Sequence, residues 1–117
     1  MFHSPINLQW PKTVRWVTPN EIKLAFNKGK FWERAKSGVL KVSLFRPERH
    51  ADPLRTHQPY CTRSQMLIYS TQAGAPVALV HQYLRPNGTV GASGKPDPKK
   101  LVIDNELLAI RAKQSKR

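Results

Sequence analysis

One segment of this sequence carries the side chains best suited to acid–base chemistry. In PVALVHQYL, residues 76–84, alternation along a β-strand places His81, Tyr83 and the following Arg85 on one face. An imidazole can transfer protons near neutral pH, and a guanidinium can stabilise negative charge on a phosphate. This pattern is compatible with phosphodiester cleavage in which His57, His81 and Arg85 are the catalytic residues. A histidine that packs in the sheet and has no catalytic role would explain the same pattern.

The glycine-rich segment after this strand ends in Gly94-Lys95, as many nucleotide-binding loops do, but it does not satisfy their pattern. Five residues separate Gly88 from Gly94 where the pattern requires four. Pro96 occupies the position of the hydroxyl residue that would bind magnesium, and the prolines prevent a helix from starting there. We interpret the segment as a turn at Asn87-Gly88 followed by a mobile basic loop that can contact phosphates.

The four histidines and the single cysteine do not have the spacing of a metal site. His57 and Cys61 lie four residues apart, but Pro59 between them prevents a regular helical turn. Cys61 would need a neighbouring histidine to act as a nucleophile. We prefer the interpretation that it is a small buried apolar residue at the entry to a strand. We therefore predict no metal and no cofactor. One cysteine also excludes an internal disulfide, which favours a reducing compartment.

Positive charge is the dominant feature of the composition. The chain has 20 Lys and Arg residues against seven Asp and Glu, which gives a formal net charge of +13. A surface of this kind attracts polyanions, and nucleic acid is the commonest of them. We therefore expect a nucleic-acid-binding protein that contacts the phosphate backbone of RNA or DNA. The residues expected to bind nucleic acid are Arg46, Arg49, Arg55, Arg63, Arg85, Lys95, Lys99 and Lys100.

Two other functions are compatible with the same composition. A small metal-independent ribonuclease, similar in element order to compact bacterial ribonuclease toxins, would combine these cations with the histidines. An interaction protein would instead present its basic surface to an acidic protein partner. Metal-dependent nucleases are disfavoured, because they gather carboxylates and this chain has only seven. The sequence distinguishes neither RNA from DNA nor one oligomeric state from another.

The elements that would position these residues begin with a helix over residues 18–37. Thr18 is a good N-cap, and Glu21 completes a capping box with it. Gly29 is expected to divide the helix into two pieces, and Gly38 is expected to end the second. The helix therefore has defined ends and one apolar face for packing.

Strands are predicted at residues 13–17, 38–45, 65–71 and 76–84. The last two are apolar on both faces, as central strands are, and the short loop QAGA joins them as an antiparallel hairpin. Alternation in residues 38–45 predicts one buried and one exposed face. Residues 104–114 fit either a strand or a helix.

These elements predict an α+β fold: a small single domain over residues 1–112, with an N-terminal helix packed on a mostly antiparallel sheet of three to five strands. Residues 113–117 are expected to form a flexible basic tail. The arginine-rich connection at residues 46–63 is long for a compact domain, and such loops are often functional. No apolar run approaches the length of a membrane span, and residues 1–10 lack the features of a signal peptide. We therefore expect a cytoplasmic protein without membrane partner.

Overall fold

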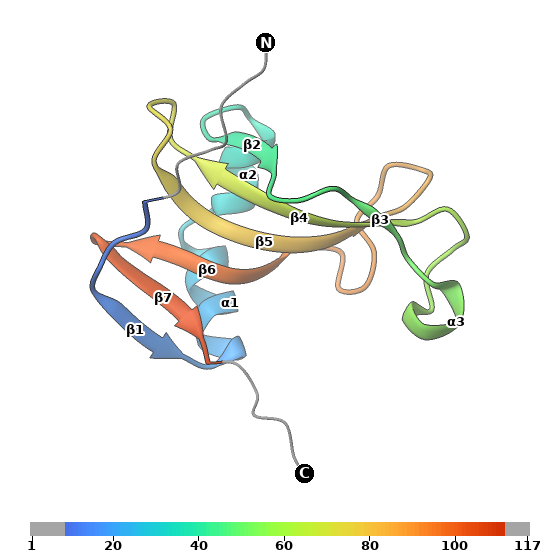
Figure 1. Cartoon of the computed structure of the whole chain (residues 1–117), viewed down its shortest axis with the longest axis horizontal. Helices are drawn as coiled ribbons and strands as arrows, with labels where there is room; N and C mark the ends of the chain where they lie inside the picture. The colour runs from blue at the N-terminus through green and yellow to red at the C-terminus, as the bar shows by residue number, and fades with distance from the viewer. Residues whose placement is uncertain (1–8, 112–117) are drawn as a thin grey trace.

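The computed structural model describes residues 9–111, which form one α+β domain around a seven-stranded sheet (Figure 1). The strands lie in the order β1-β7-β6-β5-β4-β2, and β3 pairs with the first residues of β4. The α+β class and the mostly antiparallel sheet are confirmed, but the predicted three to five strands are too few. The predicted basic tail, residues 113–117, lies outside the described residues. The strands are β1 (Val14–Val17), β2 (Lys41–Leu44), β3 (Arg49–His50), β4 (Arg63–Ser70), β5 (Pro76–Leu84), β6 (Asp97–Ile103) and β7 (Glu106–Ile110).

Three helices accompany the sheet: α1 (Pro19–Lys28), α2 (Phe31–Lys36) and the short α3 (Pro53–Thr56). The predicted capping box is present, because the Glu21 amide donates to Thr18 Oγ1 and the Thr18 amide donates to Glu21 Oε1. The predicted break at Gly29 is also confirmed. There the ring of Phe31 lies where a Cβ atom would be, so the position favours glycine. Among the described helices, none is long and apolar enough to cross a membrane.

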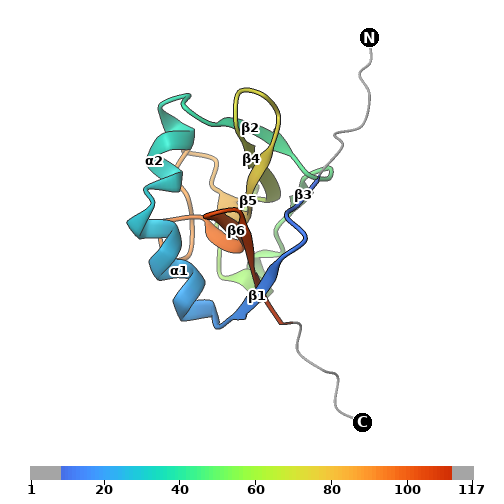
Figure 2. The same ribbon diagram turned by 90° about the vertical axis from the view of Figure 1, so that its left-hand side faces the viewer.

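Helices α1 and α2 cover one face of the sheet and leave the other face free of helices (Figure 2). Ile22 and Phe26 are buried on the inner side of α1. The Phe26 ring stacks on Phe31 at a centroid distance of 6.0 Å and lies 6.3 Å from the ring of Tyr69 on β4. The aromatic contacts therefore join both helices to the centre of the sheet.

The central hairpin of β4 and β5 is confirmed as predicted, with the two strands antiparallel. Leu67, Ile68 and Tyr69 are consecutive and all buried, so β4 is covered on both faces. The ambiguous C-terminal segment forms strand β7, because Asp104 and Asn105 both take positive φ and make a tight turn after β6. Strand β1 then pairs with β7 in parallel at the edge of the sheet.

The prediction of a buried face for residues 38–45 is wrong in part. Leu40 is buried, but Val42 and Leu44 are 46% and 48% exposed. The reason is that β2 is the outermost strand and has a partner, β4, on one side alone. The connection at residues 46–63 is not irregular throughout, since it forms β3 and α3 and projects from one end of the sheet (Figure 1).

Candidate nucleic-acid interface

His81 lies in the middle of a polar group on the helix-free face of the sheet. Its strand neighbours are Met66 on β4 and Asp97 on β6. His81 Nε2 is 2.7 Å from Ser64 Oγ, so one donates a hydrogen bond to the other according to the imidazole tautomer. The ring of Tyr83 meets the half-buried His81 ring edge-on, with centroids 4.8 Å apart. The predicted placement of His81 and Tyr83 on one face is therefore observed.

The surroundings of His81 favour its neutral form. Burial lowers the pKa of the His81 imidazole, because a charged ring would lose hydration there. The Lys99 ammonium lowers this pKa as well, the Asp97 carboxylate opposes the shift, and the Arg46 guanidinium adds to it. Burial and two nearby cations thus all lower the pKa of His81 and favour its neutral form.

A neutral His81 gives the folded protein a specific pH dependence. Because its pKa is lower in the folded chain than in the unfolded chain, the unfolded chain binds the proton more readily. The free energy of unfolding should therefore decrease as the pH falls below about 6.5, the ordinary pKa of histidine. Urea unfolding at pH 7.5 and pH 5.5 should show this loss in the natural protein and a smaller loss in His81→Gln. Equal losses in the two proteins would contradict the assignment.

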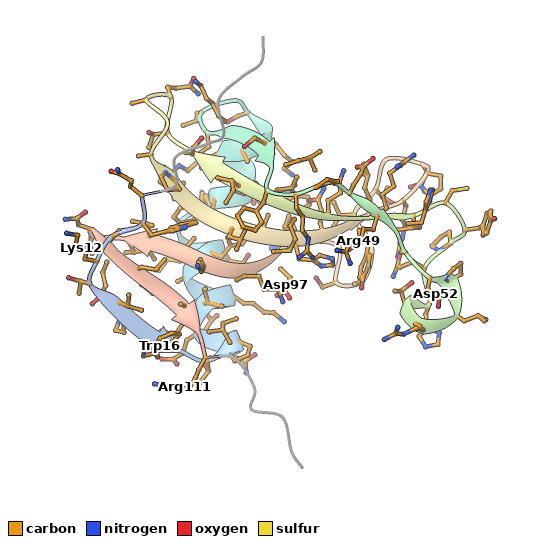
Figure 3. All side chains as sticks on the ribbon, in the orientation of Figure 1. Lys12, Trp16, Arg49, Asp52, Asp97 and Arg111 are labelled. Carbon is orange, nitrogen blue, oxygen red and sulfur yellow. The ribbon has the colours of Figure 1, made fainter. Side chains whose placement is uncertain are left out.

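Arginines extend the polar group towards α3. Arg49 pairs with Ser64 across β3 and β4, and Ser64 pairs with Tyr83 across β4 and β5. An open cavity of about 380 Å³ is lined by Arg49, Arg55, Ser64 and Tyr83, together with His50, Ala51, Asp52 and Thr56. Figure 3 shows Arg49 and Asp97 close to the middle of the view and Asp52 next to the start of α3. We call His81, Ser64, Tyr83, Arg46, Arg49 and Arg55 the His81 site.

Asp52, the acidic residue that lines this cavity, already accepts a hydrogen bond from a nearby backbone amide. Asp52 Oδ1 accepts a hydrogen bond from the Leu54 amide, as the N-cap of α3. By contrast, Arg46, Arg49 and Arg55 are exposed, and none of the ion pairs among residues 9–111 includes them. The site therefore presents three guanidinium groups that are free to bind an anion.

Three of the predicted nucleic-acid-binding residues have polar partners within the protein. Arg63 forms an ion pair of 2.8 Å with Glu48, and Lys99 forms one of 2.9 Å with Asp97. Arg85 Nε donates to Gln58 Oε1 at 3.0 Å. This bond joins the loop after β5 to the connection before β4. Arg85 thus has a structural contact in addition to any role towards a ligand.

The remaining predicted residues, Lys100, Lys95 and His57, lie outside the His81 site. Lys100 places its ammonium 5.4 Å from the ring centroid of Trp10, and Lys95 is exposed in the loop before β6. His57 ends α3 with an exposed side chain and positive φ. His57 takes no part in the hydrogen bond of His81 and does not line the cavity at Arg49, Arg55 and Tyr83.

The glycine-rich segment forms the predicted turn and then closes a second cavity. The Gly88 amide donates to the Arg85 carbonyl, and Gly88 has a φ of +87°. The cavity has a volume of about 330 Å³, and its lining combines α1, β5 and residues 91–98. Lys23 and Lys95 are the cations that line it.

Sequence reasoning missed Ser64 and Gln58, the two side chains that bond His81 and Arg85. The signal for Ser64 was its place before a predicted strand that pairs with the strand of His81. The strand register could not be counted from the loop, because a β-bulge at Tyr69 and Ser70 shifts it. Gln58 carried no comparable signal. No three His, Cys, Asp or Glu side chains gather as metal ligands within residues 9–111.

Comparison with known proteins gives no match from which a function could be inferred. The chain matches no protein-family model, no curated protein and no solved structure. What the protein does is therefore inferred from the chemistry of its own residues.

Proposed function

We propose that this protein binds nucleic acid through the phosphate backbone, and that the His81 site is its contact surface. The observation that supports the proposal best is the group of three exposed arginines, Arg46, Arg49 and Arg55, without carboxylate partners in the described chain. Arg49 and Arg55 line a cavity with Tyr83, whose ring contacts His81, and the charge of Arg46 acts on His81. The phosphates of a nucleic acid would pair with the three arginines, and its sugars or base edges would contact the two rings.

The cations of the site are of a type suited to binding phosphate. The three cations of the site that have no ion-pair partner within residues 9–111 are arginines. Their planar guanidinium can donate two parallel hydrogen bonds to one phosphate. The chain as a whole has a formal net charge of +13, so a polyanion is also attracted over a distance. The carboxylates of an acidic protein can accept the same paired hydrogen bonds, so the interaction-protein alternative has to be separated by experiment.

Salt dependence tests the proposal. Fluorescence anisotropy should give the affinity for labelled RNA and DNA at salt concentrations from 50 to 200 mM. For about four phosphate contacts, the affinity should fall roughly 100-fold over this range, because bound counterions are released on binding. An affinity that does not change with salt would contradict backbone binding. An acidic protein partner that stays bound after nuclease treatment would favour the interaction-protein alternative.

A second candidate function, metal-independent ribonuclease, is favoured by the pairing of His81 with Ser64. A neutral imidazole within 2.7 Å of a hydroxyl is a suitable proton acceptor, and Lys99 and Arg46 lie near enough to influence its charge. Mixed RNA incubated with the protein and a chelator should then be cleaved, and His81→Ala should abolish cleavage. His57→Ala tests whether the second predicted histidine takes part. Intact RNA would end this candidate and leave the binding proposal in place.

A further inference from the structure

A groove on the same helix-free face lies beside β1, β6 and β7, away from the His81 site. Its volume is about 580 Å³. The floor is apolar, while its cations come from β6 and from the residue after β7. We call it the Trp16 groove, lined by Val14, Trp16, Lys99, Lys100, Leu107 and Arg111 among others.

Two tryptophans with stacked cations belong to this region. The Trp16 side chain is 53% exposed, and the Arg111 guanidinium carbon lies 4.9 Å from its ring centroid. Trp16 and Arg111 lie together at one end of β1 and β7 (Figure 3). The half-buried Trp10 has the Lys100 ammonium 5.4 Å from its ring centroid. An exposed indole on an edge strand has no role in the core, and indole faces are good surfaces for a base.

Strand register connects the groove to the His81 site. Trp16 pairs with Ala109, and Ala109 pairs with Lys100, which pairs with Leu79 on the strand of His81. At about 4.8 Å between strands, Trp16 lies roughly 15 Å from β5 across the sheet. Lys99 connects the two regions, since it lines the groove and its charge acts on His81. One extended ligand can therefore reach both.

The charges of the groove point to an anionic ligand. Lys99, Lys100 and Arg111 line it, and none of the seven Asp and Glu side chains of the chain does. Lys99 is paired with Asp97, while Lys100 and Arg111 have no ion-pair partner within residues 9–111. Glu106, the acidic residue that begins β7, forms an ion pair with Arg15. A ligand with flat apolar groups between negative charges fits this combination, and single-stranded nucleic acid has both.

We infer that the Trp16 groove binds the bases of single-stranded RNA or DNA, while the strand continues across Lys99 to the arginines of the His81 site. This inference rests on the proposed function and specifies its substrate class. A duplex would not gain from the groove, because its bases are already stacked on each other and their faces are not free for an indole.

Trp16→Ala tests the inference. We compare its affinity for a 12-nucleotide oligo-uridine and for a blunt DNA duplex of 12 base pairs with that of the natural protein. The single-strand affinity should fall about tenfold, the effect of one lost base stack, and the duplex affinity should change less than about twofold. Trp16→Phe should retain most of the single-strand affinity. Trp32→Phe is the control for Trp16→Phe, because Trp32 lies under Lys36 on the helical side of the molecule.

A second measurement does not depend on the stability of Trp16→Ala. In the Trp10→Phe/Trp32→Phe variant, Trp16 is the single remaining tryptophan, and oligo-uridine should quench its fluorescence. An unchanged single-strand affinity in Trp16→Ala, or equal losses for single strand and duplex, would overturn the inference and leave the proposed function standing. Failure of the natural protein to bind any nucleic acid would overturn both.

Discussion

Replacing Phe26 with alanine is expected to lower the free energy of unfolding by about 3 to 5 kcal/mol, the usual cost of deleting a buried phenyl ring. Phe26 is 2% exposed and lies between the rings of Phe31 and Tyr69. Its removal would leave a cavity where α1, α2 and the centre of the sheet meet. The two surrounding rings belong to different elements, α2 and β4, so they cannot both move to fill the space.

Urea unfolding followed by circular dichroism measures this effect. Leu24→Ala is a matched control, because Leu24 is on the same helix with its side chain 70% exposed. The control should change the free energy of unfolding by no more than about 0.5 kcal/mol. A loss below about 1 kcal/mol in Phe26→Ala would show that the helices do not pack on the sheet as described.

Reversing two charges in the His81 site should have the largest effect on binding. The double variant Arg46→Glu/Arg49→Glu should lower the affinity for RNA or DNA by at least about 100-fold at 100 mM salt. Two phosphate contacts are lost, and each new carboxylate then repels the phosphate that it faces. Both arginines are exposed and without ion-pair partners in the described chain, so the substitutions should leave the fold intact.

The matched control is Lys28→Glu/Lys30→Glu, which changes the net charge by the same amount. Lys28 and Lys30 are exposed between α1 and α2, away from the His81 site. The control should lose affinity only through the reduced net charge, by less than about tenfold. Equal losses in both variants would mean that overall charge, and not this site, determines binding. Thermal melting of both variants shows whether they fold.

Local sequence signals predicted the parts of the fold that depend on neighbouring residues. The capping box of Thr18 and Glu21, the break at Gly29 and the turn at Asn87-Gly88 each arise within a few residues, and all three are observed. The hairpin of β4 and β5 was predictable for the same reason, because a short loop joins two strongly apolar strands. Edge strand β2 was predicted as a strand, but its exposure depends on which strands lie beside it.

Contacts between distant segments could not be predicted. Alternation marks residues 13–17 as a strand, yet nothing in it specifies a parallel partner such as β7 near the other end of the chain. For the same reason the hydrogen bond between Arg85 and Gln58 was not foreseen. His57 and His81 were grouped by residue type alone, and the fold of residues 46–63 into β3 and α3 places His57 at the exposed end of a helix.

The measurement that tests the account most directly is the slope of log affinity against log salt concentration, in the natural protein and in Arg46→Gln/Arg49→Gln. Each phosphate contact contributes about one unit to this slope, and glutamine removes the charge without adding repulsion. If the His81 site binds the backbone of nucleic acid, the slope of the double variant should be smaller by about two units. An identical slope in the two proteins would contradict the account, because the phosphates would then be bound elsewhere.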